Sequence, residues 1–310
     1  MKRLVITMAL LAFSIAGCTN ANPVSEFRTT VSKGCAVKEG GEVKCWGDDM
    51  VLYYAGGQKV DQGYEVPSDL GQVTQVSHEN SVTCAVQVSG VPKCWGGRGD
   101  PVLTKVPSYV DKVTQIDVGE DHTCAVTNDS ELVCWGGLYG PGDDLEIPKD
   151  LGKVLQVSVG NRTCVVTEAE QLKCWGKYPI GVPQVPEGLG TVRQVSTGAT
   201  DTCVVTTDDE AKCWGITREL KPPSDLGKVE EIDVGYHACA ITKAKTVRCW
   251  GSDRQPPSDL GQVTQISVGW SRDCAVLKSG LLRCWPEAVN DFLSAPIPGP
   301  PSDLGKILSR

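Results

Sequence analysis

Fourteen of the fifteen cysteines in this chain form seven pairs with one constant spacing. Among the side chains of this sequence, the cysteine thiol can take part in the widest range of reactions. Paired cysteines can form disulfides, ligate a metal or act as nucleophiles. In each pair the second cysteine follows the first by ten residues and precedes a tryptophan. The pairs are Cys35–Cys45, Cys84–Cys94, Cys124–Cys134, Cys164–Cys174, Cys203–Cys213, Cys239–Cys249 and Cys274–Cys284.

The sequence around the third pair predicts a β-hairpin with a disulfide across it. Residues 124–134 consist of two β-rich runs on either side of a polar turn at Asp129. Folding about Asp129 sets Cys124 opposite Cys134, and directly opposed Cβ atoms are close enough for a disulfide. We therefore predict seven disulfides within hairpins, each contributing at most roughly 3 kcal/mol through chain entropy.

The other uses of these cysteines have little support. The chain contains no Cys-x-x-Cys, and three histidines are too few to complete zinc sites in seven repeats. It also lacks His-Glu-x-x-His, Gly-x-Ser-x-Gly and a phosphate-binding loop with lysine. We expect no metal, no cofactor and no catalytic residues, with an enzyme as the less favoured alternative.

The elements that must position the pairs are short strands in a repeat. The first cysteines advance by 49, 40, 40, 39, 36 and 35 residues, which is near the period of one propeller blade of about four strands. A Pro-x-x-Leu-Gly motif alternates with the hairpins, as at residues 67–71 and 301–305. We expect an all-β fold, a seven-bladed β-propeller, with the seven Cys-Trp tryptophans in its core.

The chain begins and ends in the middle of a repeat. A closed ring then requires the N- and C-terminal segments to complete one blade together, which leaves no long edge exposed. Ile307 and Leu308 are expected to pair near the first hairpin. The alternative is that residues 27–32 supply that strand themselves.

The fifteenth cysteine lies in an N-terminal export signal. Lys2 and Arg3 precede an apolar run, residues 4–16, which is too short to span a membrane as a mature helix. Residues 15–18, Ile-Ala-Gly-Cys, resemble the lipobox of bacterial lipoproteins. The resemblance implies cleavage before Cys18 and acylation of its new N-terminus. The alternative is an ordinary cleavable signal in which Cys18 is a spare thiol.

The resemblance divides the chain into three parts. Residues 1–17 are the signal peptide, 18–24 the lipidated cysteine and its tether, and 25–310 the propeller. No aspartate follows Cys18, and in lipoproteins of this kind that implies the outer membrane, with the periplasmic or surface side left open. Export also accounts for the disulfides, because these persist in oxidising compartments.

Residues 113–126, followed by Cys134-Trp135-Gly136, resemble the repeat of the regulator of chromosome condensation family, in the cysteine-rich form of exported bacterial proteins. The resemblance covers about residues 24–310 and implies a seven-bladed β-propeller. Two departures concern the closing blade: the first repeat lacks Gly-x-x-His before Cys35, and Pro286 replaces the glycine of the last.

The charge of the chain argues against the activity of the family's founding member, a nuclear exchange factor for a small GTPase that binds chromatin. The formal charge is −8, and removal of Lys2 and Arg3 with the signal changes it to −10. Such a surface repels phosphate backbones. We therefore expect no nucleic-acid partner, and we disfavour guanine-nucleotide exchange.

In a ring, the segments between each innermost strand and the first cysteine of the same repeat converge on one face. Their residues differ from repeat to repeat, whereas the strands and cysteines recur. Aromatic and arginine side chains anchor protein interfaces, although these segments can also be ordinary polar loops. The candidates for partner contacts are Glu79, Asp121, His122, Arg162, Asp201, Tyr236, His237, Trp270 and Arg272.

The first connection, residues 48–72, is about ten residues longer than its counterparts and adds Tyr53, Tyr54 and Tyr64 as candidates. A tolerated insertion is the alternative reading of this loop.

We expect a monomeric, non-enzymatic envelope lipoprotein that binds a protein through loops on one propeller face. The alternatives are binding of a glycan or small ligand, or inhibition of an envelope enzyme.

Overall fold

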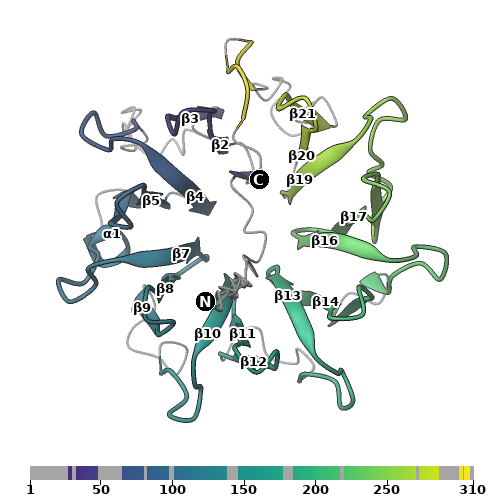
Figure 1. Ribbon diagram of the computed structural model, residues 1–310, viewed down its shortest axis with the longest axis horizontal. Helices are drawn as coiled ribbons and strands as arrows, with labels where there is room; N and C mark the ends of the chain where they lie inside the picture. The colour runs from purple at the N-terminus through teal and green to yellow at the C-terminus, as the bar shows by residue number, and fades with distance from the viewer. Residues whose placement is uncertain are drawn as a thin grey trace, which may run out of the picture.

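The computed structural model is a ring of seven antiparallel sheets around a central axis (Figure 1). It describes residues 27–29, 33–47, 65–79, 82–97, 101–137, 146–176, 184–216, 220–269, 272–285, 300–302 and 304–307. The predicted seven-bladed propeller is confirmed. Each blade has three strands in the described part of the chain rather than the expected four.

The strands of blades 1 to 7 follow one another in chain order. The innermost strands, next to the axis, are β1 (Phe27–Thr29), β4 (Val73–Glu79), β7 (Val113–Val118), β10 (Val154–Val159), β13 (Val192–Thr197), β16 (Val229–Val234) and β19 (Val263–Val268). The middle strands are β2 (Lys33–Val37), β5 (Val82–Gln87), β8 (His122–Thr127), β11 (Thr163–Thr167), β14 (Asp201–Thr206), β17 (Ala238–Thr242) and β20 (Asp273–Leu277). The outer strands are β3 (Val43–Gly47), β6 (Pro92–Gly96), β9 (Leu132–Gly136), β12 (Leu172–Trp175), β15 (Ala211–Gly215), β18 (Val247–Trp250) and β21 (Leu282–Trp285). A single turn of helix, α1 (Pro101–Thr104), follows β6.

The hydrophobic core lies between neighbouring blades. Middle strands such as β8 are buried on both faces, because each sheet packs against the sheets on either side. Between blades 2 and 3, Val86 of β5 packs with Ile116, Ala125 and Trp135 of blade 3. The small side chain at Ala125 lets the two sheets approach closely. The apolar side chains of each sheet are therefore buried by the neighbouring blades.

All seven predicted disulfides are present. Each joins directly opposed residues of a middle and an outer strand, as Cys124 and Cys134 are opposed in blade 3. Seven disulfides indicate that the protein folds in an oxidising, exported environment.

The innermost strand of blade 1 is shared by the two ends of the chain. β1 pairs with β2 through Phe27 opposite Ala36 and Thr29 opposite Gly34. Ile307 forms an antiparallel bridge with Lys38, and its N–H donates to the carbonyl of Gly280. Both segments that the sequence offered as alternatives therefore contribute, since each supplies a different part of one strand.

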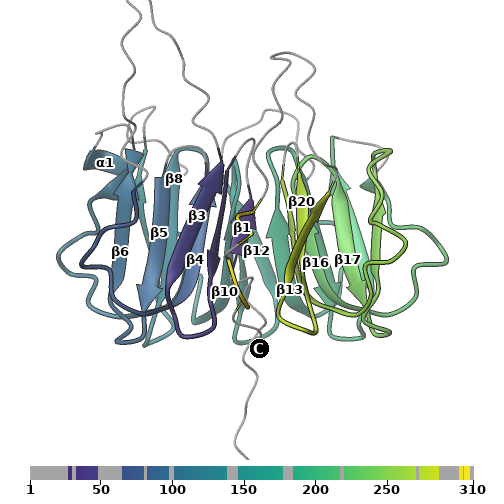
Figure 2. The ribbon, with the colours of Figure 1, turned by 90° about the horizontal axis from the view of Figure 1, so that it is seen from above.

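The strands run along the axis of the ring, so the propeller has two distinct ends (Figure 2). We call the end with the connections from innermost to middle strands the loop face, and the end with the turns from middle to outer strands the hairpin face. No helix among the described residues has the length and apolar character needed to cross a membrane.

Candidate binding face

Innermost strands of neighbouring blades are joined by hydrogen bonds from a polar side chain of one strand to the backbone of the next. We call each such set of hydrogen bonds a polar clamp. The side-chain amide of Gln115 donates from Nε2 to the Val157 carbonyl at 2.8 Å and accepts the Val157 N–H through Oε1 at 2.9 Å. Because separate sheets do not share a backbone ladder, the amide satisfies groups that would otherwise be buried without partners. Equivalent clamps join Gln75 to Ile116, Gln156 to Val195 and Gln194 to Ile232.

A second clamp lies two residues further along each strand, on the same face of the sheet. The Val118 N–H donates to Ser77 Oγ at 3.0 Å, and the Val159 N–H donates to Asp117 Oδ2 at 2.8 Å. Ser77 Oγ also donates to Asp117 Oδ1. These hydrogen bonds account for Asp117 as a buried structural acid.

A ring of glycines closes the loop-face end of the innermost strands. A Cβ atom on Gly160 would lie 2.2 Å from the Gly198 carbonyl oxygen, and one on Gly235 would lie 2.3 Å from the Val268 carbonyl oxygen. Real Cβ atoms do not approach backbone this closely. The glycines that follow the innermost strands of blades 3 to 6, Gly119, Gly160, Gly198 and Gly235, are thus required by contact with the next blade.

The histidines two residues before their cysteines lie within the joints between blades. The ring of His122 is 1% exposed, with Nε2 2.8 Å from Thr163 Oγ1 of blade 4 and Nδ1 2.6 Å from Asp121 Oδ1. His237 Nε2 lies 3.1 Å from Asp273 Oδ2 of blade 7. These contacts give both histidines a structural role in the joints between blades.

His237 also contacts the Cys239–Cys249 disulfide. Its ligand atoms and those of Cys239 and Cys249 all lie within 4.8 Å of one another, a spacing that could hold a metal. Zinc requires thiolates, and these two sulfurs are bonded to each other. The donor set therefore does not fit a metal in this state.

The structure describes eight of the residues that the sequence proposed for partner contacts, and it buries five of them. His122, Arg162, Asp201, His237 and Arg272 are each at most 7% exposed. These five side chains are therefore buried in the ring and not open at its surface, because the positions just before the first cysteine lie between blades. Burial also lowers the pKa of the Arg162 guanidinium below its ordinary value.

Fewer of the described candidates on the loop face are accessible to solvent than are buried. Tyr236 is 55% exposed, Glu120 is exposed, and Glu79 and Asp121 are half-buried. Tyr236 follows β16 directly after the glycine ring, so its backbone is held firmly while its side chain is open to solvent. The candidates Cys18, Tyr53, Tyr54, Tyr64 and Trp270, together with the predicted signal and tether, lie outside the described residues.

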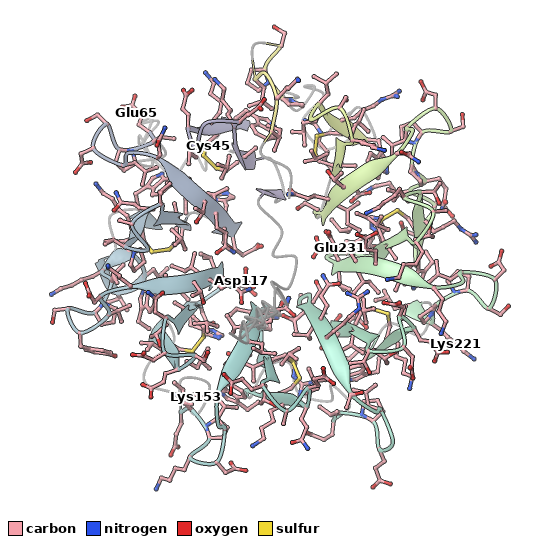
Figure 3. The ribbon with its side chains drawn as sticks, in the orientation of Figure 1. Cys45, Glu65, Asp117, Lys153, Lys221 and Glu231 are labelled. Atoms are coloured by element: carbon pink, nitrogen blue, oxygen red, sulfur yellow. A yellow bond between two sulfur atoms is a disulfide. The ribbon has the colours of Figure 1, made fainter. Side chains whose placement is uncertain are left out.

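Ion pairs surround the outer rim of the propeller. Lys93 pairs with Asp69 in blade 2, and Lys173 pairs with Asp150 in blade 4. The hydrogen bonds from these lysines lower the pKa of both aspartates below the ordinary value. Charged side chains such as Lys153 point outward at the periphery, whereas Asp117 and Glu231 lie near the axis (Figure 3).

Blade 3 departs from this rim pattern. Tyr109 takes the place of the aspartate and Val133 that of the lysine, and Tyr109 is 74% exposed. It lies in the turn before β7, away from the loop face. This tyrosine provides a matched comparison for Tyr236.

The clamping residues were missed by reasoning from the sequence. Their signal is a polar residue repeated inside each β-rich run, in the form Gln-x-Ser or Gln-x-Asp. Residues with that pattern are Gln75-x-Ser77, Gln115-x-Asp117, Gln156-x-Ser158, Gln194-x-Ser196 and Gln265-x-Ser267, with Glu231-x-Asp233 as a variant.

Comparison with known proteins relates the fold to others. The Physcomitrella patens receptor kinase CR4 ectodomain is 19% identical, with 84% of this chain and 72% of that chain covered and a TM-score of 0.68. The CRINKLY WD40 ectodomain of the Arabidopsis thaliana receptor kinase ACR4 is also 19% identical, with 84% and 97% covered and a TM-score of 0.63. Prp20p from Saccharomyces cerevisiae is 15% identical, with 71% and 73% covered and a TM-score of 0.57. At these identities the likeness shows the fold alone.

Sequence comparison adds a finer result for one blade. No curated protein matches the chain by sequence. Residues 113–137, which are the three strands of blade 3, match the regulator of chromosome condensation (RCC1) repeat. The chain is thus a seven-bladed β-propeller whose third blade matches the regulator of chromosome condensation repeat.

Proposed function

We propose that this protein is an exported, lipid-anchored propeller of the regulator of chromosome condensation type that binds a protein partner through its loop face and catalyses no reaction. The exposed ring of Tyr236 is the observation that carries this proposal. Its neighbour His237 is fully buried in the joint to blade 7, so the tyrosine is presented on a fixed support. Rigid aromatic side chains are the type that anchors interfaces.

The surroundings of Tyr236 favour a protein over a nucleic acid. The accessible charges on the loop face include the acids Glu79, Glu120 and Asp121, whereas the partly accessible cation Arg254 is paired with the buried Asp273. A phosphate backbone would be repelled by these acids and by the net charge of the mature chain. Prp20p has been described with Gsp1p and histones as partners, and the acidic balance here speaks against transferring those partners to this chain.

The partner is tested with the purified propeller from Thr19 onward, immobilised in oxidised form. Mass spectrometry of proteins retained from a solubilised envelope extract should identify one enriched protein. Its retention should fall at least tenfold with Tyr236→Ala and stay unchanged with Tyr109→Ala, since loss of a hot-spot aromatic costs about 2 kcal/mol or more. Equal retention by both variants would contradict the proposed face, and retention of glycans alone would replace the protein partner.

The anchor is tested separately in cells. Cys18 acylation would hold the propeller through two or three chains, which bind a membrane firmly where a single chain does not. Metabolic labelling with a fatty-acid analogue should mark the wild type and not Cys18→Ser. Labelling of both proteins, or of neither, would show that the N-terminal signal does not lead to a lipoprotein.

A further inference from the structure

At two positions, Glu231 and Asp273, the joint between blades 6 and 7 has an acid where the other described joints have neutral residues. Glu231 stands at the clamp position that Gln115 and Gln194 occupy in their blades. Asp273 stands directly before its cysteine, where four other blades have threonine, as at Thr163. Both substitutions fall on one joint, which makes it chemically distinct from its neighbours.

The geometry of the clamp determines which hydrogen bonds Glu231 must make with the backbone of Ile266. Ile266 N–H donates to Glu231 Oε1 at 3.1 Å, in the same way that Ile232 N–H donates to Gln194 Oε1 at 3.0 Å. In the Gln194 clamp the amide nitrogen then donates to the Ile232 carbonyl at 3.1 Å. By the register of the repeat, the second oxygen of Glu231 takes the place of that nitrogen and faces the carbonyl of Ile266.

A carboxylate and a carbonyl are both acceptors, so an ionised Glu231 would set two acceptors against each other. A carboxylic acid can donate, and then it reproduces both hydrogen bonds of the glutamine. We propose that Glu231 holds its proton at neutral pH and donates to the Ile266 carbonyl, which makes the joint between blades 6 and 7 sensitive to pH.

The surroundings of Glu231 favour its neutral form. The side chain is 3% exposed, and burial disfavours a charge. β16 carries a second buried acid, Asp233, and an accessible acid, Glu230, which is paired with Lys245.

The strands packed against β16 are β13, β14, β17 and β19. β13 carries Arg193, which pairs with Asp209, and β14 carries Asp201. β17 and β19 have no charged residue within their bounds. Across the joint on β20, Asp273 is paired with His237 and Arg254.

A proton that Glu231 keeps in the folded state determines the sign of the pH dependence of stability. Glutamate in an unfolded chain ionises at about pH 4.3. If the folded protein keeps the proton, the folded state binds more protons than the unfolded state above that pH, and stability falls as the pH rises. The unfolding constant then increases by up to about tenfold per pH unit, until Glu231 ionises in the folded ring.

The experiment compares wild type with Glu231→Gln by equilibrium unfolding in guanidinium chloride, with disulfides intact, from about pH 4 to pH 8. The two proteins should have similar unfolding constants at the acidic end. Above it, the constant of wild type relative to the variant should rise by up to about tenfold per pH unit. Glu230→Gln, which changes the exposed neighbour, should show no such divergence.

The reciprocal variant Gln115→Glu should acquire the same pH-dependent loss at the joint between blades 3 and 4. A ratio between wild type and Glu231→Gln that does not change with pH would overturn the proposal. If either variant fails to fold, infrared spectroscopy of folded wild type decides the matter. A protonated-carboxyl band that persists at neutral pH and ionises only at higher pH supports the proposal, and its absence overturns it.

Discussion

The joint between blades 3 and 4 and the joint between blades 6 and 7 have the same register and different chemistry. At the first, Gln115 clamps Val157, and His122 contacts Thr163. At the second, the equivalent pairs join Glu231 to Ile266 and His237 to Asp273. The comparison shows that the backbone repeat decides which positions meet, while the individual side chain decides whether the contact carries a charge.

The apolar parts of the two joints are closely matched. The cluster at the first contains Leu151, Val154 and Val157, and the cluster at the second contains Leu260, Val263 and Ile266 at the same positions. Packing at these three positions therefore does not distinguish the joints. Their polar clamps do differ, which makes the two joints suitable for matched variants.

The largest effect is expected from removing a neutral clamp. Gln115→Ala leaves the buried N–H and carbonyl of Val157 without their side-chain partner, and each such group costs about 1–3 kcal/mol. We expect a loss of about 3 kcal/mol in the free energy of unfolding, measured in guanidinium chloride with disulfides intact. Thr114→Ala, at the exposed neighbouring position, should cost less than about 1 kcal/mol. A similar loss from both variants would show that the clamp has no special weight.

A smaller effect is expected when Asp273, at the joint between blades 6 and 7, receives the side chain that Thr163 has at the joint between blades 3 and 4. Asp273→Thr offers His237 the hydroxyl that Thr163 offers His122, and it removes the carboxylate from Arg254. Arg254 is partly accessible and can be hydrated, so we expect a loss of about 1–2 kcal/mol in the same unfolding assay. A loss as large as that of Gln115→Ala would indicate that the joint depends on charge pairing and not on the shared register.

The smallest effect is expected at an ion pair near the surface, in the turn of blade 5. The hydrogen bond from Lys243 lowers the pKa of Asp209, and the charge of Arg193 lowers it further. Asp209→Asn should cost less than about 1 kcal/mol at neutral pH, because such pairs are screened by solvent. Asparagine also tolerates the positive φ of 62° at this position.

The pH dependence of this last pair is opposite in sign to that of Glu231. A depressed pKa stabilises the fold above the unfolded value for aspartate, about 3.9, and that contribution is lost as the pH falls through the folded value. The difference between wild type and Asp209→Asn should therefore vanish in strong acid. A difference that persists there would assign the effect to backbone conformation and not to charge.

The fold was predictable because its signals are local and repeated. A polar turn centred on Asp129 sets Cys124 opposite Cys134, and the observed register agrees. The exposure of the candidate contact residues was not predictable in the same way. Tyr236 and His237 are adjacent in the sequence, yet one is open to solvent and the other fully buried. That difference depends on where the next blade packs, which a single repeat does not contain.

The sequence by itself determined the number of blades, the hairpins, the disulfide pairs and the need for closure, because each follows from periodicity and short-range geometry. Only the tertiary structure decided how closure is made, with β1 and Ile307 sharing one strand. It also decided that Glu231 occupies a clamp position opposite Ile266. Such contacts join residues about one repeat or nearly the whole chain apart. They arise from the packing of one sheet against the next, and they become visible only when the ring is assembled.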